Sequence, residues 1–111
     1  MYKKDKLKLK INEFVAENGT DTVMDKEQIL TLAEMYDCDL KPTDFCYNYV
    51  NGRISDNYLS QPHLFEYVSW NRFRILGEDY PYSGDAVKYY RSKDKEPEIF
   101  GKWAKGKFVL K

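Results

Sequence analysis

The chain has 111 residues, in which 18 Lys and Arg balance 18 Asp and Glu, and 42% of the residues are hydrophobic. This composition predicts one folded domain over residues 1–111 and excludes a largely disordered chain. No apolar run approaches the ~18 residues that a membrane-spanning helix requires, and no signal peptide pattern is present. We therefore expect a cytoplasmic protein with no membrane partner, in which the two Cys residues stay reduced.

The balanced net charge conceals a strong segregation along the chain. Residues 1–10 have a net charge of +4, residues 11–45 of −7 and residues 101–111 of +4. Basic ends can follow a phosphate backbone, or they can be solubilising Lys residues at frayed termini. Both interpretations stay open, and residues 1–6 are predicted to form a basic N-terminal lead.

The first part of the chain predicts two helices around a short strand. Apolar residues at helical spacing predict a helix over about 6–18. A brief strand within 20–24 follows it. Asp25 and Gln28 form a capping-box pattern, which predicts a second helix over about 26–37.

A third helix is predicted over about 44–51. Pro42 pushes the residue before it out of the helical region, and Thr43 can cap a new helix. Asn51 and Gly52 tolerate the left-handed geometry that ends one. The second and third helices would then form a helix-turn-helix pair.

The second half of the chain is rich in aromatic residues, with 15 of the 18 after Asp44. Two β-favourable runs at 64–68 and 72–76 are separated by a stretch short enough for a hairpin turn. Residues 86–90 predict a last strand, and residues 100–111 are ambiguous, with an edge strand at 108–110 as one interpretation. Strands and aromatic turns are therefore expected here.

This order of elements predicts an α+β fold of the winged helix-turn-helix type. Three N-terminal helices form a helical half over 7–52, and a β-hairpin wing with an aromatic-rich C-terminal segment forms a β-rich half over 63–111. The predicted core residues are Ile29, Leu32, Phe45, Val50, Phe65 and Ile75.

Three strings occur together: TDFCYN at 43–48, HLFEY at 63–67 and LGEDYPYSG at 76–84. In this combination, over roughly residues 25–84, the chain resembles a small uncharacterised domain family of Gram-positive bacteria and their phages. The resemblance implies a companion or regulatory module in a bacterial host cell. In a phage setting it implies a counter-defence role such as that of an anti-CRISPR.

The sequence offers little catalytic chemistry. His63 is the single histidine, and Cys38 and Cys46 have no second Cys pair, which argues against a catalytic triad and a zinc site. An acidic nuclease site is the remaining enzymatic alternative, but its carboxylates lie in predicted turn and coil and are interpreted as solvated charge: Asp79, Asp85, Asp94, Glu96 and Glu98. We expect a protein that is not an enzyme, with no catalytic residue, metal or cofactor.

The favoured function is binding of nucleic acid or of a nucleic-acid-processing protein. Asn can read adenine, Arg can grip guanine or phosphate, and Tyr can stack on a base. The candidate residues on the third helix and the wing are Tyr47, Asn48, Asn51, Arg53, Arg72 and Arg74. The alternative interpretation is that Tyr47 belongs to the core and that both Asn residues are helix-end residues.

A second hypothesis is a phage-type inhibitor that binds a host defence nuclease. The acidic band of the first two helices would imitate the phosphate charge of nucleic acid, and an inhibitor of this kind needs no active site. The candidate partner face is Glu27, Glu34 and Asp37. Ordinary solvation of an outward helix face is the simpler explanation of the same residues.

Overall fold

The structure is a computed structural model that describes residues 2–35, 40–90 and 94–110. Its elements are α1 (Lys3–Asn18), β1 (Val23–Met24), α2 (Lys26–Leu32), β2 (Tyr49–Asn51), β3 (Phe65–Ser69), β4 (Arg72–Ile75), β5 (Gly84–Tyr89), β6 (Glu98–Ala104) and β7 (Lys107–Leu110), with the 3-10 helices η1 (Pro42–Phe45) and η2 (Ser55–Ser60). Within these described ranges, no helix is long and apolar enough to cross a membrane.

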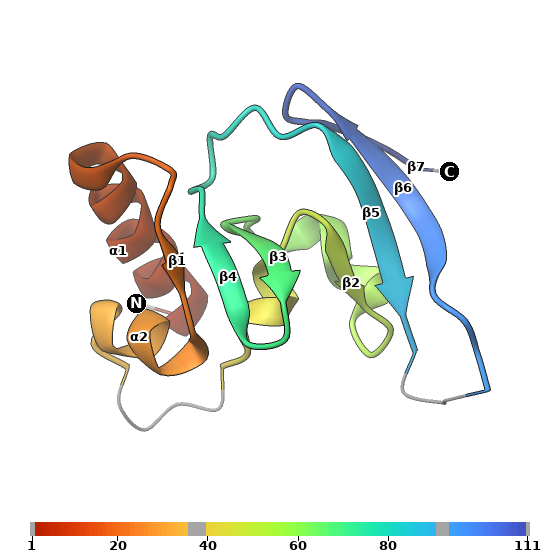
Figure 1. The fold of residues 1–111 in the computed structure, drawn as a ribbon, viewed down its shortest axis with the longest axis horizontal. Helices are drawn as coiled ribbons and strands as arrows, with labels where there is room; N and C mark the ends of the chain where they lie inside the picture. Colours follow the sequence, from red (N-terminus) through yellow and green to blue (C-terminus); the bar gives the residue numbers. More distant parts are fainter. Residues whose placement is uncertain (1, 36–39, 91–93, 111) are drawn as a thin grey trace.

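The strands form two sheets, in the orders β1-β4-β3 and β2-β5-β6-β7 (Figure 1). Every pairing is antiparallel except that of β2 with β5, which is parallel. Helices α1 and α2 lie beside the first sheet, and β6 and β7 lie at the opposite end of the molecule (Figure 1).

Two clusters of buried side chains stabilise the two halves. The helix-side core joins α1 and α2 to the first sheet and includes Leu7, Ile11, Ile29, Phe65 and Phe73. The strand-side core lies against the second sheet and includes Tyr47, Val50, Tyr58, Leu76 and Trp103. Of the predicted core residues, Ile29, Phe45, Val50, Phe65 and Ile75 are confirmed as buried, whereas Leu32 is half-buried.

The two sheets meet along a seam between residues 45–48 and 64–67. The backbone N–H of Tyr47 donates to the Phe65 carbonyl at 2.9 Å. The side chain of Asn48 then replaces the next backbone pairing, because it accepts from the Tyr67 N–H at 2.7 Å and donates to the Tyr67 carbonyl at 2.8 Å. One amide group thus continues the hydrogen bonding where the strands separate.

The α+β class was predicted, but the winged helix-turn-helix was wrong, because the described residues form one long helix and seven strands in two sheets. Residues 44–51 do not form a third helix. Phe45, Cys46 and Tyr47 are all buried, and three successive buried side chains are incompatible with the one-sided pattern of a surface helix. Pro42 is the first residue of the 3-10 helix η1, and β2 follows it along the chain.

The hairpin at 64–76 exists as β3 and β4, but it is not a wing. β4 lies between β1 and β3 and is therefore the central strand of its sheet. The strand predicted over 86–90 is β5, the edge strand predicted at 108–110 is β7, and β6 was not predicted.

The N-terminal elements follow their local signals closely. α1 begins at Lys3, so most of the predicted basic lead is helical. Asp25 and Gln28 form the predicted capping box of α2. This helix ends at Leu32, ahead of the prediction, whose last residues at 36–37 lie outside the described part of the chain.

Candidate functional site

A row of four aromatic side chains crosses the seam on the face of the sheets that carries the helix-side core. Phe73 of β4 contacts Tyr67 of β3, with ring centroids 5.9 Å apart. Tyr67 lies 5.0 Å from Tyr49 of β2, and Tyr49 stacks on Tyr89 of β5 at 4.4 Å. This aromatic row therefore connects four strands from both sheets.

A groove of about 730 Å³ opens over part of this row. Its floor is formed by Tyr49, Tyr67 and Phe73, and its walls come from the start of α2, from residues 41–43 and from the β3–β4 turn. Trp70 stands in that turn at the border of the groove and is 84% exposed. A largely exposed tryptophan beside half-buried tyrosines leaves aromatic surface available to a ligand.

The turn that carries Trp70 is held against α2. Asn71 has a positive φ of 55°, a left-handed conformation that Asn tolerates better than most residues. Its side-chain oxygen accepts a hydrogen bond from the Lys26 backbone N–H at 3.0 Å. This bond fixes the distance between two walls of the groove.

Both charged and polar groups border the aromatic floor. Lys26 and Lys41 lie on the walls with Asp25 and Glu27, so the charged lining is balanced, and within the described residues neither Lys forms an ion pair. Burial raises the pKa of Tyr49, and the neighbouring Tyr67 adds to the effect, so the Tyr49 hydroxyl stays protonated at neutral pH. The groove can therefore stack a planar ring and donate hydrogen bonds, and its two lysines can each contact an anionic group.

The predicted binding residues of 47–53 are engaged inside the fold. Tyr47 is buried, and the single proton of its hydroxyl is shared between the carbonyls of Gly77 at 2.7 Å and Glu78 at 3.0 Å. Asn48 forms the seam described above. The alternative interpretation of Tyr47 as a core residue therefore describes its position.

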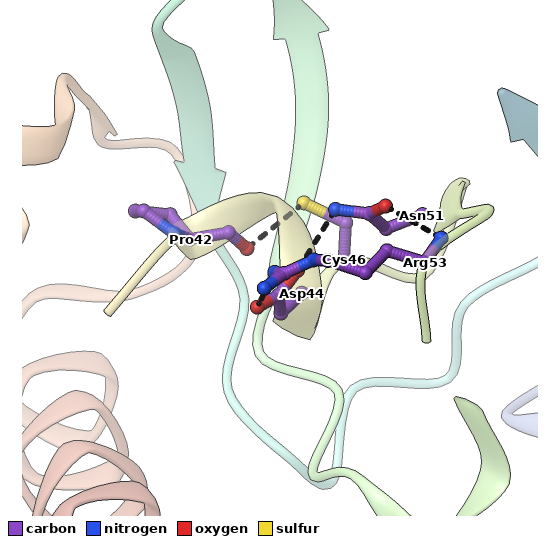
Figure 2. A network of polar contacts seen from close by, with 5 residues as sticks. All are labelled: Pro42, Asp44, Cys46, Asn51 and Arg53. Atoms are coloured by element: carbon purple, nitrogen blue, oxygen red, sulfur yellow. Dashed lines mark hydrogen bonds and ion pairs between the residues drawn. The ribbon is translucent and has the colours of Figure 1, made fainter. Parts of the chain in front are cut away.

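Asn51 and Arg53 converge on Asp44 (Figure 2). The Asn51 amide donates to Asp44 at 3.1 Å, and the Arg53 guanidinium forms an ion pair with the same carboxylate at 3.0 Å. The neighbouring Cys46 thiol donates to the Pro42 carbonyl at 3.4 Å (Figure 2), and burial raises the pKa of this thiol well above its ordinary value. These contacts connect η1 to the end of β2 and leave Arg53 partly neutralised.

The two predicted arginines of the hairpin differ in their surroundings. Arg72 is exposed at the start of β4. Arg74 lies on the sheet face opposite the aromatic row, where it pairs with Glu66 at 3.7 Å and donates to the Tyr80 hydroxyl at 3.1 Å. Neither arginine borders the groove.

The predicted acidic face is divided. Glu27 borders the groove. Glu34 forms an ion pair with Lys10 at 3.0 Å, which lowers the pKa of Glu34. Asp37 lies outside the described residues. As for metal sites, the described parts of the chain hold no group of three or more His, Cys, Asp or Glu that could bind an ion.

His63 lies just before β3 and is enclosed by aromatic rings. Its ring centroid is 4.5 Å from that of Tyr58 and 4.9 Å from that of Trp103. Burial lowers its pKa to about 4, and a hydrogen bond with the Tyr58 backbone acts in the opposite direction. The imidazole is therefore neutral at physiological pH and belongs to the strand-side core.

The groove residues Tyr49, Tyr67, Trp70 and Asn71 were missed by the sequence reasoning. A signal did exist, because Tyr67 and Phe73 lie at paired positions on either side of a turn that contains a tryptophan. Paired positions of a hairpin share one face, so these two rings had to lie together.

The fold and the groove define a small α+β domain with an aromatic groove where two sheets are joined. The chain belongs to the family described as "Domain of unknown function (DUF7225)", whose model matches residues 6–110. The match confirms the expected resemblance to a small uncharacterised domain family.

A relative from Bacillus subtilis (strain 168), the "Uncharacterized protein YnaC", is 37% identical to the chain over 106 residues. The alignment covers 93% of this chain and 35% of the relative, so the chain spans little more than a third of that protein. No solved structure matches the chain significantly.

Proposed function

We propose that this domain is a non-enzymatic module of the bacterial cytoplasm that binds nucleic acid by stacking an unpaired base in the aromatic groove. The observation that carries the proposal is the exposed Trp70 at the border of a groove floored by Tyr49 and Tyr67. Stacking on aromatic side chains is the main way in which proteins bind single strands without sequence preference, because every base has a π-face.

The groove walls support the same ligand. Lys26 and Lys41 can approach the phosphates that flank a stacked base, and each phosphate contact releases counterions. The hydrogen bond from the Lys26 N–H to the Asn71 side chain fixes the groove before the ligand arrives, which reduces the entropic cost of binding. A duplex is a poorer ligand, since its bases are already stacked and paired.

Binding of short fluorescein-labelled oligothymidylate and oligouridylate, measured by anisotropy against a duplex of equal length, tests the proposal. Trp70→Ala should weaken single-strand binding about 5- to 150-fold, because one stacked base contributes ~1–3 kcal/mol. Trp70→Phe should retain most of the affinity. Leu59→Ala, at another exposed apolar residue that does not line the groove, is the matched control.

Fluorescence and salt dependence give two independent readouts. Trp70 is exposed and Trp103 is buried, so a stacked base should quench the emission of Trp70, and the quench should disappear in Trp70→Phe. Lys41→Gln should reduce the salt slope for single strands by about 0.7. Equal affinities of the wild type and Trp70→Ala would overturn the proposal. A wild type that binds no oligonucleotide would do the same and would favour the inhibitor hypothesis instead.

A further inference from the structure

The two long-range helices leave one face of the second sheet uncovered. Ala86 of β5 belongs to the strand-side core, so its neighbours Asp85 and Val87 point to the opposite face of the sheet. Helices α1 and α2 lie beside the first sheet, at the other end of the molecule (Figure 1). We call this surface the open face, and its central residues are Asp85, Val87, Ile99, Lys102 and Val109.

The pairing of β5 with β6 places two matched pairs on the open face. Asp85 is the direct partner of Lys102, and Val87 is the direct partner of Ile99. Asp85, Ile99 and Lys102 also border one hollow of about 470 Å³, which shows that they share this face. Directly opposite residues have Cβ atoms ~4.5–5.5 Å apart. Each pair therefore lies across the line between β5 and β6.

These side chains have little to contact within one chain. Asp85 and Lys102 are exposed, and among the described residues neither forms an ion pair. Ile99 and Val109 are apolar, yet they are 43% and 62% exposed. An apolar surface that carries charges of both signs fits a partner that presents the same combination.

A second copy of the chain presents this combination. In a two-fold dimer, each contact between two different residues occurs twice, once in each direction. An axis parallel to the strands, midway between β5 and β6 and in front of the open face, places Lys102 of each copy over Asp85 of the other. The same axis places Ile99 over Val87. One symmetry operation therefore pairs both charges and covers both apolar residues.

Lys107 does not oppose this arrangement. It lies on β7, one strand beyond Lys102, so the axis leaves the two Lys107 residues of a dimer on opposite sides of it. A strand spacing of ~4.8 Å separates them by about 14 Å along the sheets, which exceeds the Debye length of ~8 Å in physiological salt. The repulsion between these like charges is therefore screened.

We propose that the domain forms a two-fold homodimer in which the open faces of two copies pack together. The face consists of three short strands, so the interface is small and the dimer forms at high protein concentration. The site is independent of the aromatic groove, because the hollow and the groove are lined by different residues.

Sedimentation equilibrium of the full chain, without nucleic acid, tests the proposal. The mass should rise from one chain to two as the concentration increases from micromolar to millimolar. Asp85→Lys and Lys102→Asp should each weaken the dimer at least tenfold, because each variant brings like charges together across the axis. An equimolar mixture of the two variants should associate again, since the exchanged charges then face opposite charges.

The double variant Asp85→Lys with Lys102→Asp keeps a charge pair within each chain and across the axis. It should therefore dimerise like the wild type, even if a single reversal destabilises the fold. Glu17→Lys, at an exposed residue of α1, is the matched control and should leave the dimer unchanged, as should Trp70→Ala.

A wild type that stays monomeric over the whole concentration range would overturn the proposal. A dimer that both single reversals leave intact would do the same, and so would a mixture that does not associate. Failure of the groove proposal would show in oligonucleotide binding by Trp70→Ala, and it does not affect the sedimentation result.

Discussion

Asn48→Ala should destabilise the domain more than any other single change at a half-buried polar residue of the seam. The substitution removes two hydrogen bonds, of 2.7 and 2.8 Å, and leaves the N–H and C=O of Tyr67 without their partners. Each hydrogen bond contributes about 1 kcal/mol, and a buried group left unpaired costs ~1–3 kcal/mol. Because the site is half-buried, water replaces part of this, and we expect a loss of about 2–3 kcal/mol.

The free energy of unfolding in urea, followed by tryptophan fluorescence, measures this loss. Asn48→Asp should be destabilised as well, since its carboxylate can accept from the Tyr67 N–H but faces the Tyr67 carbonyl without a donor. Asn57→Ala is the matched control, because Asn57 is exposed and its substitution should change stability by less than about 0.5 kcal/mol. If the unfolding midpoint of Asn48→Ala equals that of Asn57→Ala, the seam does not depend on this amide.

Two further predictions concern the strand-side core and β6. The pKa of His63 falls from 6.5 to about 4 on folding, so the folded protein keeps its full stability above pH 6.5. The free energy of unfolding should fall by about 3 kcal/mol as the pH is lowered toward 4, because the unfolded chain binds a proton that the buried ring does not. In urea titrations, His63→Phe should abolish this dependence. An identical pH profile of the two proteins would contradict the assignment. Gly101→Ala should lower the melting temperature, because overpacking costs ~1–3 kcal/mol. The added Cβ would overlap the Phe108 ring and lie 2.7 Å from the Val109 carbonyl oxygen. An unchanged melting temperature would contradict this packing.

Local signals in the sequence predicted the elements that depend on local interactions. The Asp25 and Gln28 pair starts α2, and the turn between the runs at 64–68 and 72–76 joins a hairpin. The Pro42 and Asn51 signals were also genuine, but η1 and the end of β2 use them in place of a helix. Start and stop signals mark boundaries, and they do not decide which element lies between them.

The pairings that define the fold join residues that are far apart in the chain. β2 pairs with β5, and the seam pairs Tyr47 with Phe65, across long intervening segments. No periodicity in a single segment shows such a partner. The winged-helix prediction therefore failed at β2, where the assignment depends on which distant strand is available.

Asn48 shows how a correct signal led to a different role. Because Asn can read adenine, we interpreted Asn48 in the predicted third helix as a base-reading residue. The side chain instead substitutes for backbone between two strands. A polar side chain that hydrogen-bonds like a peptide group has the same sequence signature as one that binds a ligand.

The seam also joins stability to the proposed binding surface. Tyr67 belongs to the first sheet and Tyr49 to the second, and their rings are held 5.0 Å apart across the point where Asn48 replaces backbone pairing. A ligand that stacks on both rings would stabilise the joined arrangement in proportion to its binding free energy. The groove therefore lies at the seam where side chains join the two sheets. The Asn48 hydrogen bonds that hold the sheets together also set the distance between the Tyr49 and Tyr67 rings.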